Sequence, residues 1–310
     1  MTTQAFGGIL VPALTPFDAR LNPDASRLLA HCNWLLAQGA DGLAVFGTTS
    51  EASSLGIEER IDLLDYLIDN GIPSQQLMPG TGTCAVVDTA RLTRHAVERG
   101  CRGVLMLPPF YYKAVDDDGL FASYAEVVAR VGDGRLRIYL YHIPPVAQVG
   151  LSLALVGRLL TAFPSTIAGI KDSSGDWRNT EAILREYPEL ATFCGSETFL
   201  LETLRHGGAG SITATANINP AQIRELYGAW QSEGAQALQD GITAVRKAYA
   251  GYAAIPALKA VVAGRLEAPD WLRVRPPLVS LSQAEQATLL GELERAGFTL
   301  DPATPLRARA

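Results

Sequence analysis

One lysine stands at the end of an apolar run. Residues 165–175 read as a buried strand that ends at Lys171 and continues into a polar turn. A strongly hydrated amine is seldom placed in a buried position unless a partner or a reaction uses it. Lys171 is therefore a candidate nucleophile, an amine that an apolar pocket leaves free to attack a carbonyl and form a Schiff base. The alternative is a strand-end lysine that reaches into solvent.

The chain contains three other lysines, Lys113, Lys247 and Lys259. Lys247 and Lys259 fall in helix-like segments, where the expected position is the surface, with the amine in solvent. Lys113 follows the aromatic run at 110–112 in a predicted loop and belongs either to the surface or to a site. Only Lys171 ends a strand pattern, so it is the strongest candidate for amine chemistry.

The composition favours a soluble enzyme. The 310 residues are 48% hydrophobic and 19% charged, with a net charge of −6. This length suits one large α/β barrel or two ordinary domains. The acidic balance and the lack of a Lys/Arg cluster argue against nucleic-acid or anionic-membrane partners.

Targeting and metal signals are also missing from the sequence. The first residues have no basic start of the kind that opens a signal peptide, and no apolar run approaches the roughly 20 residues of a membrane span. A cytoplasmic location is the expectation. The four cysteines have no CxxC spacing, which predicts buried free thiols and neither a zinc site nor a disulfide framework. We expect no metal and no cofactor.

Short apolar runs alternate with helix-like segments from residue 7 to about 232, and alternation of this kind predicts a parallel sheet. Eight strands are expected, at residues 8–14, 42–46, 76–80, 103–107, 136–141, 166–171, 191–194 and 210–214. Amphipathic helices are expected between them, among them 26–38, 58–70, 86–99 and 152–163. Gly39, Gly71 and Gly100 stand where left-handed glycines end helices.

Eight strand–helix units in about 225 residues predict a TIM (β/α)8 barrel over residues 1–232. A dinucleotide-binding sheet is disfavoured because no GxGxxG follows the first strand. Residues 233–310 read as a C-terminal helical region, with a proline-marked break near 268–277 and a final helix at about 282–296. The tail, 301–310, is expected to fray.

A barrel places its active site at the carboxyl ends of its strands. This rule brings together the polar segments at 47–51, 108–112, 141–145, 171–173, 195–197 and 213–217. The glycine-rich segment 207–210 precedes a strand and falls on the opposite face, so we interpret it as a turn. An amine, a phenol and hydroxyl groups gathered in this way suit imine chemistry on a 2-oxo acid.

From residues 9–17 to about residue 220, the sequence resembles the dihydrodipicolinate synthase and N-acetylneuraminate lyase superfamily of class I, Schiff-base aldolases. The resemblance rests on five motifs in the family's order: GTTSE at 47–51, FYY at 110–112, YHIP at 141–144, GIKD at 169–172 and GGAGSIT at 207–213. Five ordered matches at compatible spacing are highly specific. The resemblance implies an oligomer, usually a dimer of dimers.

The resemblance also implies roles for individual residues. Lys171 would form the imine with pyruvate, and Tyr141 would be the acid/base beside it. Thr49 with Thr48 would hold the carboxylate and help to relay protons. A free phenol is a weak acid at neutral pH, so Tyr141 has to be poised by a partner such as Thr49 or by the iminium charge. Two further roles are implied, for Tyr112 across a dimer interface and for the backbone of Ile212 against pyruvate.

Each of these residues also has a purely structural interpretation. Tyr141 and Tyr112 could be core aromatics, Thr48 and Thr49 could cap the next helix, and Glu197 could be a helix cap or a solvated acid. His142 is predicted to pack behind the site, because it alternates away from Tyr141 on its strand. Three other histidines are interpreted as residues of helix surfaces: His31, His95 and His206.

One departure from the family pattern bears on the substrate. In the synthases, an arginine shortly after the tyrosine of the fifth strand grips the carboxylate of the second substrate. This sequence has no arginine between Tyr141 and Arg158, and a carboxylate without its bidentate partner binds more weakly. Polar residues at that end of the site could instead bind hydroxyls of a sugar-acid chain, with Ser173, Glu197 and Thr215 as candidates. Gly195, in the same segment as Glu197, is a further substrate-binding candidate.

The leading hypothesis is therefore an aldolase that cleaves a 2-keto-3-deoxy sugar acid, or a related 2-oxo-4-hydroxy acid, to pyruvate and an aldehyde. A dehydratase acting through the same imine is the first alternative. Dihydrodipicolinate synthesis is disfavoured by the missing arginine. A barrel that binds 2-oxo acids without turnover is the alternative from a different functional class.

Overall fold

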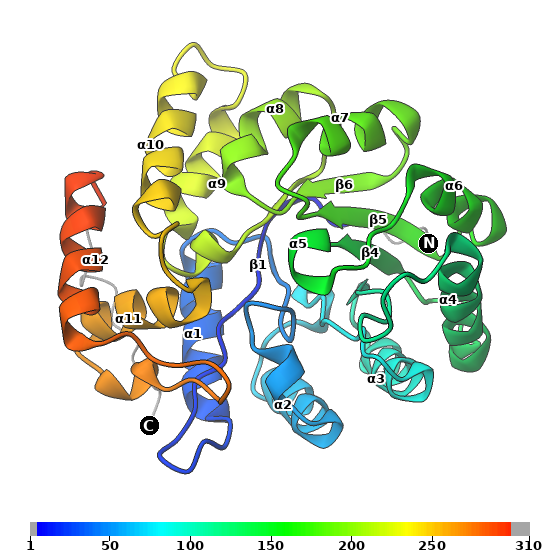
Figure 1. Ribbon diagram of the computed structural model, residues 1–310, viewed down its shortest axis with the longest axis horizontal. Coiled ribbons are helices and arrows are strands. Elements are labelled where there is room, and N and C mark those ends of the chain that lie inside the picture. The colour runs from blue at the N-terminus through cyan, green and yellow to red at the C-terminus, as the bar shows by residue number, and fades with distance from the viewer. Residues whose placement is uncertain (1–4, 299–310) are drawn as a thin grey trace.

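The computed structural model describes residues 5–298 and contains one sheet of seven parallel strands (Figure 1). The strands lie in the order β2-β1-β7-β6-β5-β4-β3. Their bounds are β1 Gly8–Val11, β2 Gly42–Leu43, β3 Val104–Met106, β4 Ile138–His142, β5 Ile167–Asp172, β6 Ala191–Cys194 and β7 Gly210–Ile212. Each falls within a predicted strand or overlaps it closely.

An eighth segment closes this sheet into a barrel. Leu77 bridges Leu43 in β2, and Gly80 bridges Leu105 in β3, both in the parallel sense. The amide of Met78 donates to the carbonyl of Leu43 at 2.9 Å, which extends the same ladder. The predicted strand at 76–80 is thus present as two bridges between the edge strands. The predicted barrel fold is confirmed, with seven regular strands and one irregular stave.

Helices alternate with the strands and surround the sheet (Figure 1). Around the barrel they are α1 Ala25–Ala37, α2 Ile57–Asp69, α3 Val86–Glu98, α4 Asp117–Val131, α5 Pro144–Ala147, α6 Leu153–Ala162, α7 Trp177–Glu186, α8 Leu200–Arg205 and α9 Pro220–Ala229. The predicted helices match α1, α2, α3 and α6 within a residue or two. Gly39, Gly71 and Gly100 follow their helices with φ between 79° and 100°, as expected.

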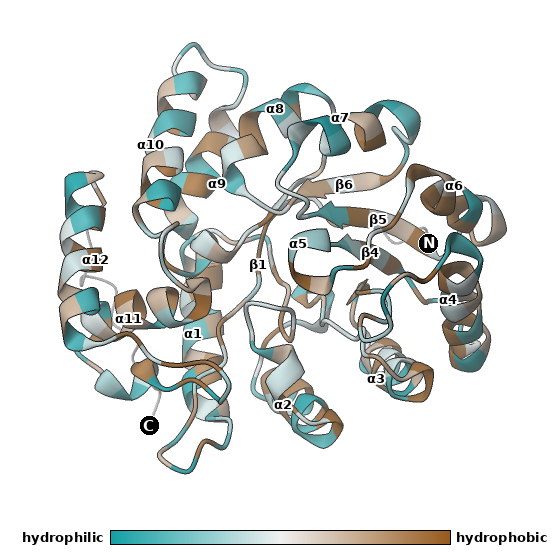
Figure 2. Ribbon diagram, in the orientation of Figure 1, coloured by the Kyte–Doolittle hydropathy of each residue, from teal (hydrophilic) through white to brown (hydrophobic). Residues whose placement is uncertain are grey.

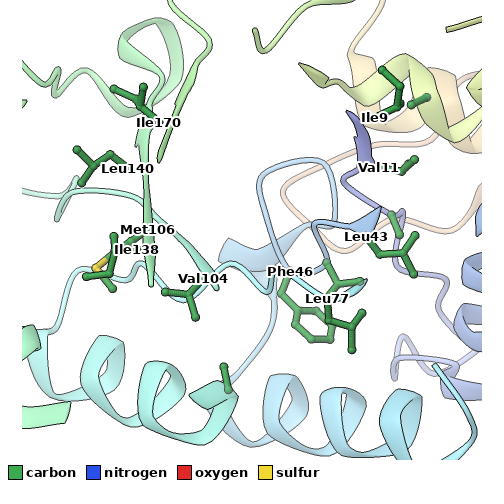
Figure 3. Packing of buried hydrophobic residues seen from close by; sticks show 14 of the residues in the cluster. Ile9, Val11, Leu43, Phe46, Leu77, Val104, Met106, Ile138, Leu140 and Ile170 are labelled. Atoms are coloured by element: carbon green, nitrogen blue, oxygen red, sulfur yellow. The ribbon is translucent and has the colours of Figure 1, made fainter. Parts of the chain in front are cut away.

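The hydrophobic core fills the space between the strands and the helices. Figure 3 shows side chains of this core on both sides of the barrel, including Ile9, Leu43, Leu77 and Ile170. The helices in Figure 2 carry hydrophobic and hydrophilic stretches together, as helices with one buried face do. A second set of apolar residues, Leu10, Tyr139 and Phe193 among them, lies inside the barrel. The strands are therefore buried on both faces, which explains their nearly continuous apolar runs.

The chain after the barrel is helical. It forms α10 Ala235–Ala248, α11 Ala254–Leu266, the short helix η5 Pro269–Leu272 and α12 Gln283–Arg295. These helices share a core of their own, which contains Leu258, Val261, Trp271 and Leu289. The predicted final helix matches α12, while the predicted frayed tail lies outside the described residues. Across residues 5–298, no helix has the length and apolar character that a membrane span needs.

Two surface predictions are wrong. Lys259 in α11 has no exposed side chain and pairs with Glu51. His31 in α1 is also fully buried, and its Nε2 lies 3.0 Å from Oδ1 of Asn217. In both cases the covering residues come from segments about 200 residues away in sequence, so helical periodicity alone could not show the burial.

The prediction of buried thiols is only partly right. Cys32 and Cys194 are buried and Cys101 is half-buried, but Cys84 is exposed. Burial raises the pKa of the thiols of Cys32 and Cys194 to about 12. These two thiols are therefore protonated, inert parts of the core.

Candidate active site

Two neighbouring strands bring the lysine and the tyrosine together. Tyr141 in β4 and Lys171 in β5 are directly paired in the parallel register. The Nζ of Lys171 donates to the hydroxyl of Tyr141 at 3.2 Å and lies 4.2 Å from the centre of its ring. Only 4% of Lys171 and 3% of Tyr141 is exposed. The solvent-facing alternative for Lys171 is therefore excluded.

The next hydrogen bond leads to the turn after β2. The Tyr141 hydroxyl donates to Oγ1 of Thr48 at 3.3 Å. The sequence suggested Thr49 as the partner of Tyr141, and the structure corrects this to Thr48. Thr49 is half-buried in the same turn.

Neither threonine caps a helix. Glu51 precedes the short helix η1 Ala52–Ser54 without a side-chain cap, and α2 is capped at Gly56. The helix-cap interpretation of Thr48 and Thr49 is therefore wrong. A cavity of about 20 Å³ opens beside Thr48 and Tyr141, enough for a water molecule at this hydroxyl pair.

Ser173 and Gly195 meet where β5 and β6 end. The amide of Ser173 donates to the carbonyl of His142 at 2.7 Å, and that of Gly195 donates to the carbonyl of Asp172 at 2.6 Å. These bonds continue the strand ladders past Lys171. Ser173 is therefore held against the Tyr141 strand just past the amine, and Gly195 lies on the other side of β5, at the end of β6.

Glu197 is buried at the same end of the barrel. Its side chain has no exposed surface, and the hydroxyl of Thr213 donates to its Oε2. Its Oε1 is buried and has no hydrogen-bond partner among the described residues. Ser196, not Glu197, caps the short helix η3 Glu197–Phe199, so neither the cap nor the solvated-acid interpretation of Glu197 holds. A buried, unpartnered carboxylate oxygen is a strong acceptor for a hydroxyl group.

Sequence reasoning missed two residues that lie near Glu197. Arg246 and Tyr249 come from α10, outside the predicted barrel, and both interact electrostatically with Glu197. The Tyr249 hydroxyl lies 2.6 Å from that of Thr215, and burial raises the pKa of Tyr249 to about 12. The site residues were predicted from segments that follow strands, and α10 is not such a segment. Only the tertiary structure shows that Arg246 and Tyr249 lie near Glu197.

Three other predicted positions differ in their surroundings. Ile212 ends β7 and is fully buried beside the site. His142 is buried, and its Nδ1 accepts from the amide of Leu151 at 2.9 Å, so it packs as predicted. Burial lowers the pKa of His142, with Asp172 acting in the opposite sense. Tyr112, by contrast, is 71% exposed in the loop after β3, with its ring 5.6 Å from that of Tyr111.

Comparisons with known proteins identify the family. The model of the dihydrodipicolinate synthetase family matches residues 5–296. The chain belongs to this family. An uncharacterized DapA-like lyase from Chloroflexus aurantiacus is 34% identical over 94% of this chain and 98% of its own length.

Solved structures of the family agree with this fold. A dihydrodipicolinate synthase from Agrobacterium tumefaciens is 34% identical, with a TM-score of 0.87 over 93% of this chain and 99% of its own. A prophage protein of the same family from E. coli K12, in complex with pyruvate, is 26% identical with a TM-score of 0.86, over 95% and 99% of the two chains. As a member of the dihydrodipicolinate synthetase family, the protein is a lyase.

The family's second-substrate arginine has no counterpart after Tyr141. The first arginine in that direction, Arg158, lies in α6, where it pairs with Asp118 at 2.8 Å and lies 4.9 Å from the ring centre of Phe121. Its side chain is engaged on the helical layer and is 44% exposed. The segment from Tyr141 to Arg158 therefore offers no arginine side chain to bind a second carboxylate at the site.

Proposed function

We propose that the protein is a pyruvate-forming class I aldolase that cleaves a 2-keto-3-deoxy sugar acid or a related 2-oxo-4-hydroxy acid. The observation that carries this proposal is the buried Lys171 amine, 3.2 Å from the Tyr141 hydroxyl. A buried amine next to a hydroxyl that can exchange protons with it is the arrangement that imine formation requires. The pyruvate bound to the E. coli relative supports a 2-oxo acid as the ligand.

The proposed reaction begins when the Lys171 amine attacks C2 of the ketone and water is lost, which leaves a protonated imine. The iminium draws the electron pair of the C3–C4 bond toward nitrogen. As that bond breaks, the C4 hydroxyl gives its proton to the Tyr141–Thr48 pair and leaves as an aldehyde. The remaining enamine takes a proton at C3, and hydrolysis releases pyruvate and the free amine.

The substrate end of the site supports a polyhydroxy acid. Oε1 of Glu197 is buried without a partner, and the hydroxyls of Ser173 and Thr215 come from the neighbouring strand ends. These groups accept hydrogen bonds from sugar hydroxyls without requiring a second carboxylate. The missing arginine after Tyr141 weighs against dihydrodipicolinate synthesis, although the Agrobacterium relative carries that name.

The decisive experiment is borohydride reduction in the presence of pyruvate, followed by mass spectrometry of the peptide that contains Lys171. The proposal expects pyruvate to be fixed on Lys171 and on no other lysine, including the buried Lys259. The Lys171→Met variant should remain unlabelled. An unmodified Lys171 peptide at saturating pyruvate would favour a binder without turnover or a different substrate class.

Product analysis separates the aldolase from the dehydratase. Both begin with the same imine, but a dehydratase expels a hydroxyl and keeps the carbon chain intact. Incubation with a panel of 2-keto-3-deoxy acids should release free pyruvate and an aldehyde. Water loss without free pyruvate would favour the dehydratase over the aldolase.

We also propose that Tyr112 acts in the site of a second copy of the chain. Tyr111 and Tyr112 are 74% and 71% exposed on one loop, and large aromatic side chains of this kind mark interfaces. Lys113 steadies the loop by donating to the carbonyl of Ala147 at 2.8 Å. Mixing inactive Lys171→Ala and Tyr112→Ala chains should restore part of the activity. A purely monomeric protein in sedimentation would contradict this arrangement.

A further inference from the structure

A buried ion pair joins the C-terminal helices to the turn that carries Thr48 and Thr49. Nζ of Lys259, from α11, lies 2.5 Å from Oε1 of Glu51, and neither side chain has any exposed surface. The same Nζ donates to the carbonyl of Arg273 at 2.7 Å and lies 4.4 Å from the ring centre of Phe17. The ammonium is therefore enclosed by one carboxylate, one carbonyl and one aromatic face.

The other oxygen of the same carboxylate is also held by the C-terminal region. The amide of Arg275 donates to Oε2 of Glu51 at 3.0 Å. The guanidinium of Arg275 forks onto Glu59 in α2, with NH1 2.7 Å from Oε2, and NH1 also donates to the carbonyl of Ser54 at 2.7 Å. Lys259 and Arg275 thus clasp the segment between β2 and α2 at Glu51 and Ser54, and Arg275 also holds α2 at Glu59.

This clasp is connected to the reactive lysine by hydrogen bonds. The backbone of Glu51 is left-handed, with φ at 57°, and its amide donates to the carbonyl of Thr48 at 3.1 Å. The hydroxyl of Thr48 accepts from Tyr141, and the hydroxyl of Tyr141 accepts from Lys171. Glu51 is thus linked through Thr48 to the hydroxyl of Tyr141.

Stability alone is a poor reason for such a pair. The free-energy cost of removing two charges from water offsets much of the attraction between them. Well-packed apolar residues in the same place often stabilise a core as well as a buried ion pair does, or better. Burial lowers the pKa of Lys259 to about 8, while Glu51 acts in the opposite sense. Unlike an apolar contact, the ion pair fixes the orientation of the Glu51 carboxylate. It thereby also fixes the conformation of the turn that carries Thr48 and Thr49.

We propose that Lys259 and Glu51 are positioning residues, which hold the Thr48–Thr49 turn in the geometry that binds the carboxylate of the 2-oxo acid and supports Tyr141. This inference rests on the proposed function, because the role of the turn depends on imine formation at Lys171. It gives the C-terminal helices a part in catalysis, although Lys259 and Glu51 are bonded to each other and to Arg273 and Arg275, and have no hydrogen bond to Lys171 or Tyr141 among the described residues.

The test uses the borohydride reaction as a titration with pyruvate. In Lys259→Met, the pyruvate concentration for half-maximal labelling of Lys171 should rise by about tenfold, the loss of one charge-assisted hydrogen bond. Labelling at saturation should be retained, because the amine itself is unchanged. Glu51→Gln/Lys259→Met should show a similar rise, and because it leaves no charge unpaired it decides the matter if Lys259→Met fails to fold.

Two controls separate positioning from general loss of stability. Leu289→Ala opens a cavity in the C-terminal core of α12 and should lower stability without moving the half-maximal concentration. Lys247→Met removes an exposed lysine from α10 and should change neither quantity. The positioning role is overturned if wild-type protein is labelled and both Lys259→Met and Glu51→Gln/Lys259→Met reach half-maximal labelling at the wild-type pyruvate concentration. If wild-type protein is not labelled at Lys171, the proposed function fails instead.

Discussion

The direction of two hydrogen bonds decides what the central residues can do. Lys171 donates to the Tyr141 hydroxyl, and that hydroxyl donates to Thr48. A phenol in the middle of such a chain can receive a proton on one side while it releases one on the other. Tyr141 is therefore placed to move protons, whereas Lys171 is placed to make the covalent bond.

Replacing Tyr141 by Phe tests this division of roles. The ring would still pack beneath Nζ of Lys171, which lies 4.2 Å from its centre, so the pocket should survive. Loss of the hydroxyl should lower kcat by about 10²- to 10⁴-fold, the usual range for one general acid/base group, with little change in KM. Steady-state kinetics on the preferred keto acid would measure both. A selective rise in KM would instead assign Tyr141 to substrate binding.

Thr48 and Thr49 form a matched pair for a second prediction. Only Thr48 accepts from Tyr141, so Thr48→Val should lower kcat by about tenfold or more through loss of that partner. Thr49→Val should act mainly on the binding of the 2-oxo acid and raise KM. Parallel kinetics on the two variants would show the difference. Equal effects on kcat would mean that the proton path does not run through Thr48 in particular.

The sequence predicted where the residues at strand ends lie, but it did not predict the contacts of the residues on helices. Lys171, Tyr141 and the two threonines follow apolar runs, and the barrel rule gathers such positions without knowledge of the packing. Lys259 occupies an ordinary helical position, and its partner Glu51 is 208 residues earlier. A contact of that separation leaves no trace in local periodicity.

Among the elements, β5 and β6 are in close contact just beyond Lys171. A Cβ added at Gly195 would lie 1.9 Å from Oγ of Ser173 and 2.8 Å from the carbonyl oxygen of Asp172. Only a residue without a side chain fits this contact. The spacing of the two strand ends, and with it the width of the site beside the amine, depends on glycine at 195.

Gly195→Ala should therefore force the ends of β5 and β6 apart. The cost of this overpacking is about 1–3 kcal/mol in the free energy of unfolding, and turnover should fall because Lys171 moves with its strand. Gly241→Ala in α10 is the matched control, since nothing lies within 4 Å of its added Cβ; it should stabilise by up to about 1 kcal/mol. Denaturant melts and kinetics on both variants would check this. Normal turnover in Gly195→Ala would show that the contact does not shape the site.

The residues of segment 76–80 explain why this part of the barrel is not a regular strand. The segment 76–80 contains Pro79, which has no amide hydrogen to donate to a neighbouring strand. A Cβ at Gly80 would lie 2.2 Å from the carbonyl oxygen of Phe46, so the backbones are unusually close there. The apolar run predicted the position of this stave, but its irregular pairing depends on contacts that the sequence does not reveal.

In the whole molecule, the barrel and the C-terminal helices meet around His31. Nε2 of His31 contacts Asn217, whose side-chain oxygen also accepts from the amide of Leu14 at 2.9 Å. The ring packs edge-on against Trp271 of η5, at 5.1 Å between centres. A buried imidazole thus joins the first helix, the end of the barrel and the C-terminal region.

Burial lowers the pKa of His31 to about 4, against 6.5 for the free side chain. Between these values the unfolded chain binds a proton that the folded protein excludes, so stability falls as the pH is lowered. From pH 7 to pH 5 this residue should remove about 2 kcal/mol from the free energy of unfolding. Urea titrations at both pH values should show a correspondingly smaller drop in His31→Gln, which cannot take up the proton. His206→Gln, at a ring that is 42% exposed, should keep the wild-type drop, and an unchanged drop in His31→Gln would place the acid sensitivity at other groups.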